Sequence, residues 1–97
     1  MNAIEVLEGL LGHRIACAFV VVARINQMDV SVVPYTVGTA IHFTGKNAPT
    51  YDILTNSLPS DRRECVKMLL DHMFPKRIVK LEDFPEIANL LNKEEKV

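Results

Sequence analysis

Apolar residues recur at helical spacing at the start of the chain. They fall three and four positions apart and share one helix face: Ile4, Leu7, Leu10 and Leu11. Asn2 is a candidate N-cap, and Glu5 stands three positions later, as in a capping box. Gly12 accepts the left-handed conformation that is common just past a helix end. The pattern predicts an N-terminal helix that ends at Gly12.

Residues 13–44 fit two patterns, and the fold class depends on them. In the strand interpretation, β-branched or aromatic residues alternate with small or polar ones along residues 35–44. The apolar run from Ile15 to Ile25 is then a central strand covered on both faces, which has no need to alternate. Residues 26–34 hold the connection, with a short extra strand at Val30–Val33.

In the helical interpretation, the apolar side chains of the same run fall three and four residues apart: Leu11, Ile15, Ala18, Val22 and Ile25. The run Val20–Val22, Gly38 and three threonines oppose a helix, because each costs a few tenths to about 1 kcal/mol relative to alanine. We therefore favour strands for residues 13–44. An all-α, winged-helix-like fold is the alternative.

The second half of the chain has clearer boundaries. Gly45–Pro49 predicts a loop, and residues 50–57 a short helix that Pro59 ends. A helix over residues 61–74 follows, capped by Ser60 or Asp61. It carries a buried stripe: Cys65, Val66, Leu69, Leu70 and Met73.

Two further elements and a tail complete the chain. Residues 77–81 predict a short strand, and Asp83 with Glu86 predicts the cap of a last helix. Residues 92–97 are expected to form a frayed tail. We predict one compact α+β domain over residues 1–97, in which the N-terminal helix is followed by a small antiparallel sheet. The C-terminal helices then pack on one face of that sheet.

Composition supports a globular domain. The chain has 97 residues, of which 48% are hydrophobic. Its longest apolar run, Ile15–Ala23, is well short of the roughly 20 residues that span a membrane. We see no secretory signal, so we expect a cytoplasmic protein with Cys17 and Cys65 as free thiols.

Charge is distributed unevenly along the chain. Its formal net charge is -1, but residues 46–81 hold seven basic and four acidic side chains, whereas residues 82–97 hold two basic and five acidic ones. A basic run of this kind is usually a solvated face, and it can also steer an acidic partner. Lys80 belongs to this basic group. We predict partner binding by these residues: Lys46, Asn47, Arg62, Arg63, Lys67, Lys76 and Arg77.

One segment of this region suggests a DNA-binding alternative. Thr44 and Gly45, with Tyr51 six positions after the glycine and Leu54 beyond, resemble the turn and second helix of a helix-turn-helix. The resemblance implies DNA contacts from Lys46 and Asn47 at the turn, and from Arg62 and Arg63 on the next helix. The second helix would carry Asp52 and no basic residue, which disfavours phosphate contact. The alternative interpretation, without a DNA-binding role, is a strand, a loop and a short helix.

Chemistry-bearing side chains suggest no catalytic, cofactor or metal site. His13, Cys17, Cys65 and His72 together form a ligand set that zinc accepts, but their spacing differs from common structural sites. The three histidines are candidate bases for either thiol, yet both cysteines fall on predicted buried stripes, where thiols are inert. No phosphate-binding loop or serine nucleophile motif is present.

The apolar excess of the first 45 residues is the strongest functional indication. More than half of them are hydrophobic, and a surface that a small domain leaves uncovered is often closed by a second copy. We therefore expect a non-enzymatic interaction or regulatory protein that binds another protein, as a homo-oligomer. The alternative is a small helix-turn-helix transcription regulator.

Overall fold

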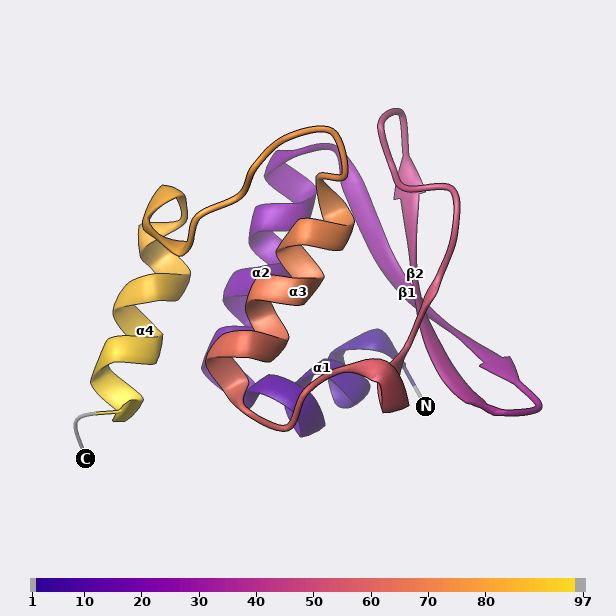
Figure 1. The fold of residues 1–97 in the computed structure, drawn as a ribbon, viewed down its shortest axis with the longest axis horizontal. Coiled ribbons are helices and arrows are strands. Elements are labelled where there is room, and N and C mark those ends of the chain that lie inside the picture. Colours follow the sequence, from indigo (N-terminus) through magenta and orange to yellow (C-terminus); the bar gives the residue numbers. More distant parts are fainter. Residues whose placement is uncertain (1, 96–97) are drawn as a thin grey trace.

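The computed structural model describes residues 2–95, which form four α-helices and a three-stranded antiparallel sheet (Figure 1). The fold class is therefore α+β, as predicted, and the all-α alternative is not favoured. The main elements are α1 (Ala3–Leu11), α2 (His13–Ile25), β1 (Met28–Tyr35), β2 (Gly38–Gly45), β3 (Ile53–Leu54), α3 (Arg62–Met73) and α4 (Pro85–Glu95). Two 3-10 turns, η1 (Thr55–Ser57) and η2 (Leu81–Asp83), precede α3 and α4.

The first helix matches the prediction at both ends. The Asn2 side chain accepts a hydrogen bond of 2.9 Å from the backbone N–H of Glu5, which satisfies one of the unpaired donors of the first turn. At the other end Gly12 has φ 80° and ψ 161°, a backbone conformation that essentially only glycine adopts. Gly12 thereby ends α1 and turns the chain directly into α2.

The prediction of a central strand over Ile15–Ile25 is wrong, because these residues form helix α2. The side chains at helical spacing bury one face: Ile15, Ala16, Phe19, Val22 and Ala23. Burying a large apolar side chain contributes about 1.5–3 kcal/mol, which outweighs the few tenths that each β-branched residue costs a helix. Asn26 ends the helix, and its side-chain amide donates to the carbonyl of Val22.

The antiparallel sheet lies within residues 28–54 rather than 13–44. Strands β1 and β2 form a hairpin whose register runs from Met28 opposite Gly45 to Tyr35 opposite Gly38. The strand predicted over residues 35–44 is thus interrupted by a two-residue turn at 36–37, and the short strand predicted at Val30–Val33 is the middle of β1. The helix predicted at residues 50–57 is wrong, because the segment forms β3 and η1.

Two helices, α3 and α4, complete the fold. The Asp61 side chain accepts a hydrogen bond from the backbone N–H of Glu64 and begins α3, as predicted. The strand predicted over residues 77–81 is absent from the described sheet, whose strands are β1, β2 and β3. Helix α4 begins at Pro85, a first-turn position that suits proline, and continues through residues 92–95 of the expected tail. Residues 96 and 97 of that tail lie outside the described residues.

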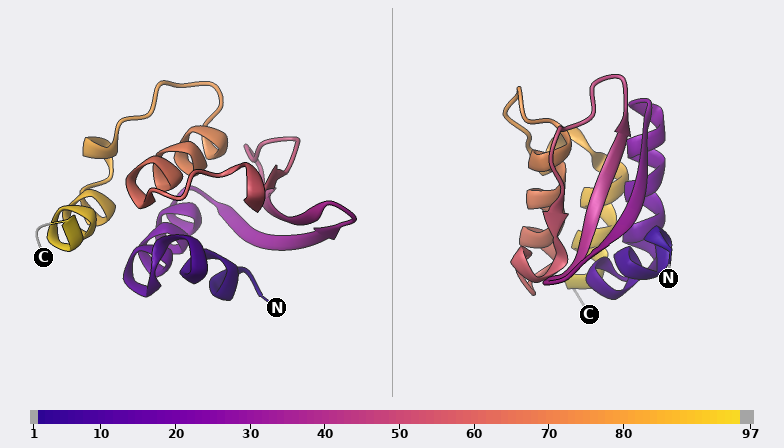
Figure 2. Two further views of the ribbon diagram at one scale, coloured as in Figure 1. Left: turned by 60° about the horizontal axis from the view of Figure 1, so that its bottom comes forward. Right: turned by 90° about the vertical axis from the view of Figure 1, so that its right-hand side faces the viewer.

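The core lies between the hairpin and the helices. Helix α2 contacts α1, β1 and α4, and α1 also contacts α3. The ring of Phe19 on α2 packs edge-on against that of Phe43 on β2, with centroids 6.1 Å apart. Figures 1 and 2 show α2 and α3 side by side, with the hairpin on one side of this pair and α4 on the other side. Within residues 2–95, every helix is too short or too polar to cross a bilayer.

Candidate functional site: a basic cleft

The seven residues predicted to bind a partner fall into two groups at opposite ends of α3. Arg62, Arg63 and Lys67 lie in its first two turns. The other four predicted residues line a cleft beside its last turn: Lys46, Asn47, Lys76 and Arg77. We call the first group the paired end and the second group, with the cleft that it lines, the basic cleft.

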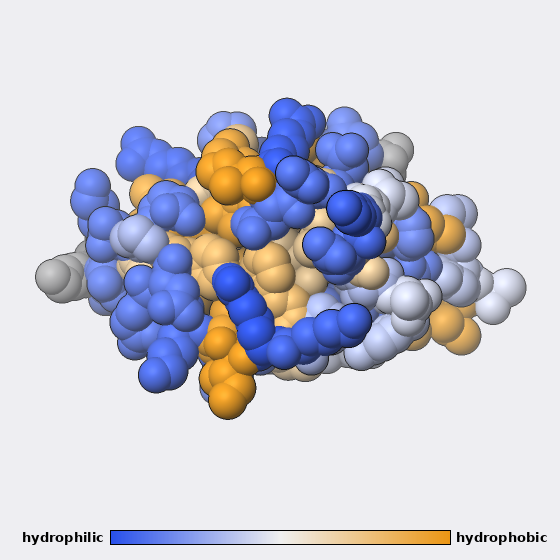
Figure 3. Space-filling view, turned by 90° about the horizontal axis from the view of Figure 1, so that it is seen from above, coloured by the Kyte–Doolittle hydropathy of each residue, from blue (hydrophilic) through white to orange (hydrophobic). Residues whose placement is uncertain are grey.

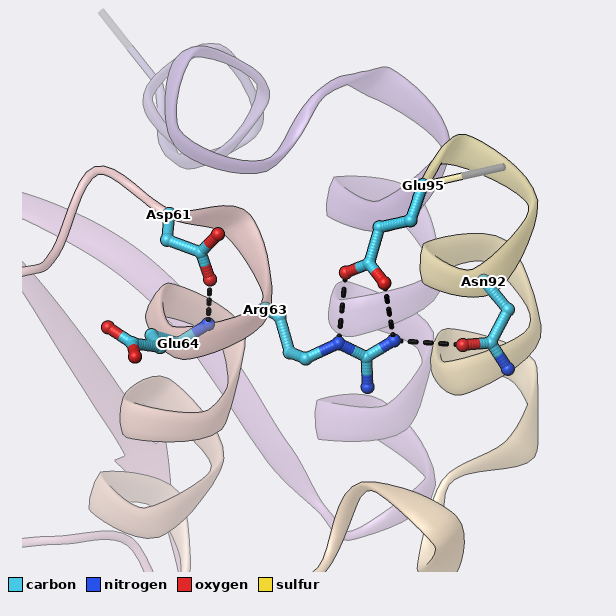
Figure 4. A network of polar contacts seen from close by, with 5 residues as sticks. All are labelled: Asp61, Arg63, Glu64, Asn92 and Glu95. Atoms are coloured by element: carbon cyan, nitrogen blue, oxygen red, sulfur yellow. Dashed lines mark hydrogen bonds and ion pairs between the residues drawn. The ribbon is translucent and has the colours of Figure 1, made fainter. Parts of the chain in front are cut away.

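Every cation of the paired end has an acidic partner. The Arg62 Nη1 lies 2.7 Å from Glu94 Oε2 on α4, and Lys67 Nζ lies 3.0 Å from Asp71 Oδ1 within α3. Arg63 makes the most contacts, since its Nε and Nη2 donate to the two carboxylate oxygens of Glu95 at 2.9 and 3.0 Å (Figure 4). Arg62 and Arg63 thereby link the start of α3 to the end of α4, whereas the Lys67 pair lies within α3.

The Arg63 contacts also set the charge of that end. Nη2 of Arg63 donates a third hydrogen bond, of 2.8 Å, to the side-chain oxygen of Asn92. The bidentate hydrogen bonds from Arg63 hold the pKa of Glu95 below its ordinary value, and Glu95 in turn raises the pKa of Arg63. Both groups stay charged at neutral pH and neutralise each other. The paired end therefore offers little unpaired positive charge to a partner.

The basic cleft has a volume of about 600 Å³ and lies between two loops that are distant in sequence. Residues 46–51 form one wall, residues 73–77 the other, and Asn26 and Met28 line it from the junction of α2 and β1. Lys46, Lys76 and Arg77 contribute positive charge, and the described lining includes no aspartate or glutamate. In the part of the chain that the structure describes, none of these three cations makes an ion pair.

The cleft has an apolar floor. Met28 and Met73 are buried members of the core. Figure 3 looks down on the end of the molecule that carries the two loops, where long hydrophilic side chains project across a more hydrophobic surface. The guanidinium of Arg77 lies 4.3 Å from the ring centroid of Phe74, and this ring stacks on Phe84. This cation–π contact orients Arg77, and within residues 2–95 the guanidinium makes no side-chain hydrogen bond.

Asp52 anchors the first wall to the sheet. Its two carboxylate oxygens accept 2.5 Å hydrogen bonds, one from the hydroxyl of Tyr35 on β1 and one from Nδ1 of His42 on β2. The hydrogen bond from Tyr35, and to a smaller extent that from His42, holds the pKa of Asp52 below its ordinary value. The hydrogen bond to Asp52 also raises the pKa of Tyr35. The carboxylate nearest to this wall is therefore committed to its own neighbours, and the wall is held in place.

His72 supports the same wall from α3. The imidazole is buried, its ring centroid lies 4.9 Å from that of Tyr51, and its Nε2 has no hydrogen-bond partner among the described residues. Burial lowers the pKa of His72, and the backbone of Tyr51 and the charge of Asp52 oppose that shift only in part. His72 is thus a neutral packing partner of the cleft wall at neutral pH.

The grouping of Tyr35, His42 and Asp52 was not predicted from the sequence. Asp52 is 17 residues from Tyr35 and 10 residues from His42 in the sequence. Only the pairing of the hairpin strands and the path of the following loop bring the three side chains together. The sequence pattern places Tyr35 and His42 in a strand, and it also makes His42 one of three candidate bases for a thiol. Asp52 was read as a residue that weakens DNA binding, and no spacing rule links it to either of the others.

The residues considered for metal binding or catalysis separate into different environments. Cys65 is fully buried, and burial raises the pKa of its thiol to about 11. Cys17 was also expected to be buried, but it is partly exposed and has a sulfur–nitrogen distance of 3.8 Å to Nε2 of His13. Within residues 2–95, no three histidine, cysteine or acidic side chains group in a way that could hold a metal ion.

The helix-turn-helix resemblance is wrong in its geometry. The position of the first helix is strand β2, which Gly45 ends, and the position of the second helix is a loop followed by β3. Lys46 and Asn47 therefore line a cleft wall instead of preceding a recognition helix. Chemically, the cleft suits an anionic group flanked by apolar atoms.

In comparisons with known proteins no family model matches this chain, and no curated protein or solved structure shows significant similarity to it.

Proposed function

We propose that this protein is a non-enzymatic interaction protein that binds an acidic segment of another protein in the basic cleft. The observation that carries the proposal is the meeting of Lys46, Lys76 and Arg77 around one apolar floor, with no carboxylate in the described lining. The formal net charge of the chain is -1, so general attraction to anions is weak. Recognition then depends on the local charge of the cleft.

The size of the cleft suits a short peptide segment. Its volume of about 600 Å³ lies within the usual range of roughly 300–1,000 Å³ for ligand pockets. Carboxylates of the partner would pair with the cations at the rim, and an apolar side chain between them would contact the accessible apolar lining, Ala48, Phe74 and Pro75. Complementary charge at the rim raises the association rate, whereas burial of the apolar side chain slows dissociation.

The test is fluorescence anisotropy with a labelled peptide of aspartate and glutamate residues around a central leucine or phenylalanine. Charge reversal of the cleft cations, in the triple variant K46E/K76E/R77E, should weaken binding at least about tenfold, since a contact worth about 1.4 kcal/mol changes affinity tenfold. The matched control is the triple variant K67E/K80E/K93E, which makes the same change in net charge outside the cleft lining. It should retain most of the affinity.

Two outcomes would contradict the proposal. If both triple variants lose affinity equally, the binding reports net charge and the cleft is not the site. If the peptide does not bind the unmodified protein, but duplex DNA of similar charge does and only the cleft variant loses it, the partner is nucleic acid. The DNA titration therefore belongs in the same experiment, at two salt concentrations, because phosphate binding depends steeply on salt.

Self-association and a cytoplasmic location complete the proposal. Much of the apolar excess of the N-terminal half is buried in the core, but Val21 and Ile25 remain exposed one turn apart on α2. This pair supports a contact between two copies. Sedimentation that shows a strict monomer across the micromolar range would contradict it.

Two free thiols suit a reducing compartment such as the cytoplasm.

A further inference from the structure

Three side chains with complementary chemistry meet at the junction of α1 and α2. His13 Nδ1 lies 2.9 Å from Oε2 of Glu8, and His13 Nε2 lies 3.8 Å from Sγ of Cys17. The imidazole thus stands between a carboxylate and a thiol. None of the three residues lines the basic cleft, so this site is separate from the proposed function.

The local fold explains why the three side chains meet. Gly12, at φ 80° and ψ 161°, turns the chain between the two helices, and α1 and α2 pack on each other. Glu8 lies in the last turn of α1, and the backbone N–H of Gly12 donates to its carbonyl. His13 and Cys17 are four residues apart on α2, so they share one face.

The order of the contacts determines what the histidine can do. An ionised Glu8 carboxylate accepts hydrogen bonds only, so the proton of a neutral His13 imidazole is held on Nδ1. Nε2 then carries a lone pair that faces the thiol of Cys17 and can accept its proton. A nucleophile, a base in contact with it and a third group that orients the base are the arrangement that activates a thiol.

We propose that Cys17 is a reactive thiol that forms mixed disulfides with low-molecular-weight disulfides, with His13 as its base and Glu8 as the residue that positions His13. In the reaction, His13 Nε2 takes the proton of Cys17, and the thiolate attacks one sulfur of the disulfide. A new sulfur–sulfur bond forms to Cys17 while the original one breaks. The displaced thiolate leaves and takes up the proton from His13.

The mixed disulfide is the end point of this reaction within one molecule. Cys65, the second thiol of the chain, is fully buried in the core and cannot attack the new bond without unfolding. Its raised pKa, about 11, keeps it protonated at neutral pH. Cys17 is therefore a site of stoichiometric covalent modification, which a free thiol in solution reverses.

The test measures the rate at which each thiol reacts with glutathione disulfide and with an aromatic disulfide reagent. We expect mass spectrometry to show one added group on the folded protein, which Cys17→Ser abolishes and Cys65→Ser leaves in place. Cys17 in the folded Cys65→Ser variant should react about tenfold faster at neutral pH than in the same variant unfolded in urea, where the thiol is unassisted and only a few per cent is thiolate.

Variants of the partner residues separate activation from mere exposure. His13→Gln should remove most of the tenfold acceleration and make the reaction require higher pH, while the thiol stays partly exposed. Glu8→Gln should slow the reaction less, and Glu5→Gln is its matched control, because Glu5 lies on the same helix and makes no side-chain contact with His13. Equal rates for wild type and His13→Gln, or for folded and unfolded protein, would overturn the proposal.

Discussion

The two ends of α3 carry similar numbers of cations and differ in what surrounds them. At the paired end, Arg62 and Arg63 contact Glu94 and Glu95, which α4 places beside them. At the basic cleft, Lys46, Lys76 and Arg77 face one another across an apolar floor. The first set contributes to the architecture of the helices, and the second is available to a partner.

The difference shows that the availability of a charge depends on the fold. Arg63 and Glu95 are 32 residues apart, so no local charge pattern connects them. Exposed ion pairs of this kind contribute little to stability, but they occupy the donors that a partner would need. The cleft cations have no such neighbour within residues 2–95, because Asp52, on the adjacent loop, is already bonded to Tyr35 and His42.

The largest expected effect is that of Gly12→Ala, which disturbs the paired end. A Cβ at this position would lie 2.9 Å from Nη1 of Arg62, and φ is 80° there. Backbone strain of this kind costs about 1–3 kcal/mol, so urea denaturation should show a loss of that size. Gly9→Ala is the matched control, because a Cβ there meets nothing within 4 Å, and it should be neutral or stabilising. An equal loss in both variants would contradict the account of this junction.

A smaller effect is expected from pH, and it acts on the wall of the basic cleft. The folded pKa of His72 lies below its ordinary value of 6.5, so the unfolded chain binds more protons as the pH falls past that value. The contribution of His72 to the free energy of unfolding is therefore greatest above about pH 6.5 and decreases as the pH falls. The urea midpoint should therefore drop between about pH 7.5 and pH 5.5, a range well above the titration of Asp52.

His72→Asn isolates this contribution. The variant retains His13 and His42, so any pH dependence that they cause is common to both proteins. The drop in the urea midpoint should be smaller in the variant than in the wild type. If the variant and the wild type lose the same stability on acidification, His72 does not cause the pH dependence. Burial of its imidazole then has no measurable effect on stability in this pH range.

The smallest expected effect is that of Arg63→Gln. The substitution removes the bidentate contact with Glu95, and both groups lie at the surface, so the unfolding midpoint should hardly change. Amide hydrogen exchange in the last turn of α4 should become faster, because that turn loses its link to α3. Binding of the acidic peptide should stay the same. A loss of peptide binding would mean that the paired end also takes part in recognition.

The sequence predicted best where local chemistry decides the structure. The caps at Asn2 and Asp61 were identified from short-range patterns, and the structure confirms both. The strand prediction for segment 15–25 is wrong because its apolar run, Ile15–Ala23, fits both a buried strand and a buried helix. The segment is a helix because that conformation buries one face against α1, β1 and α4. The contacts with α4 involve residues far away in the sequence.

The candidate sites show the same division. The basic residues were identified by composition, but their separation into a paired end and a basic cleft depends on contacts across about a third of the chain. The contact between His13 and Cys17 follows from their spacing of four once α2 is a helix. It was set aside because the strand interpretation placed Cys17 in the core. No sequence pattern indicated that Tyr35, His42 and Asp52 contact one another.

The most direct test of the basic cleft as the contact site is a map of backbone amide chemical shifts during titration with the acidic peptide. If the basic cleft binds the peptide, the shifts concentrate in residues 46–51 and 73–77, with little change in residues 61–67 and 92–95. Shifts concentrated at the paired end, or none at saturating peptide, would contradict it.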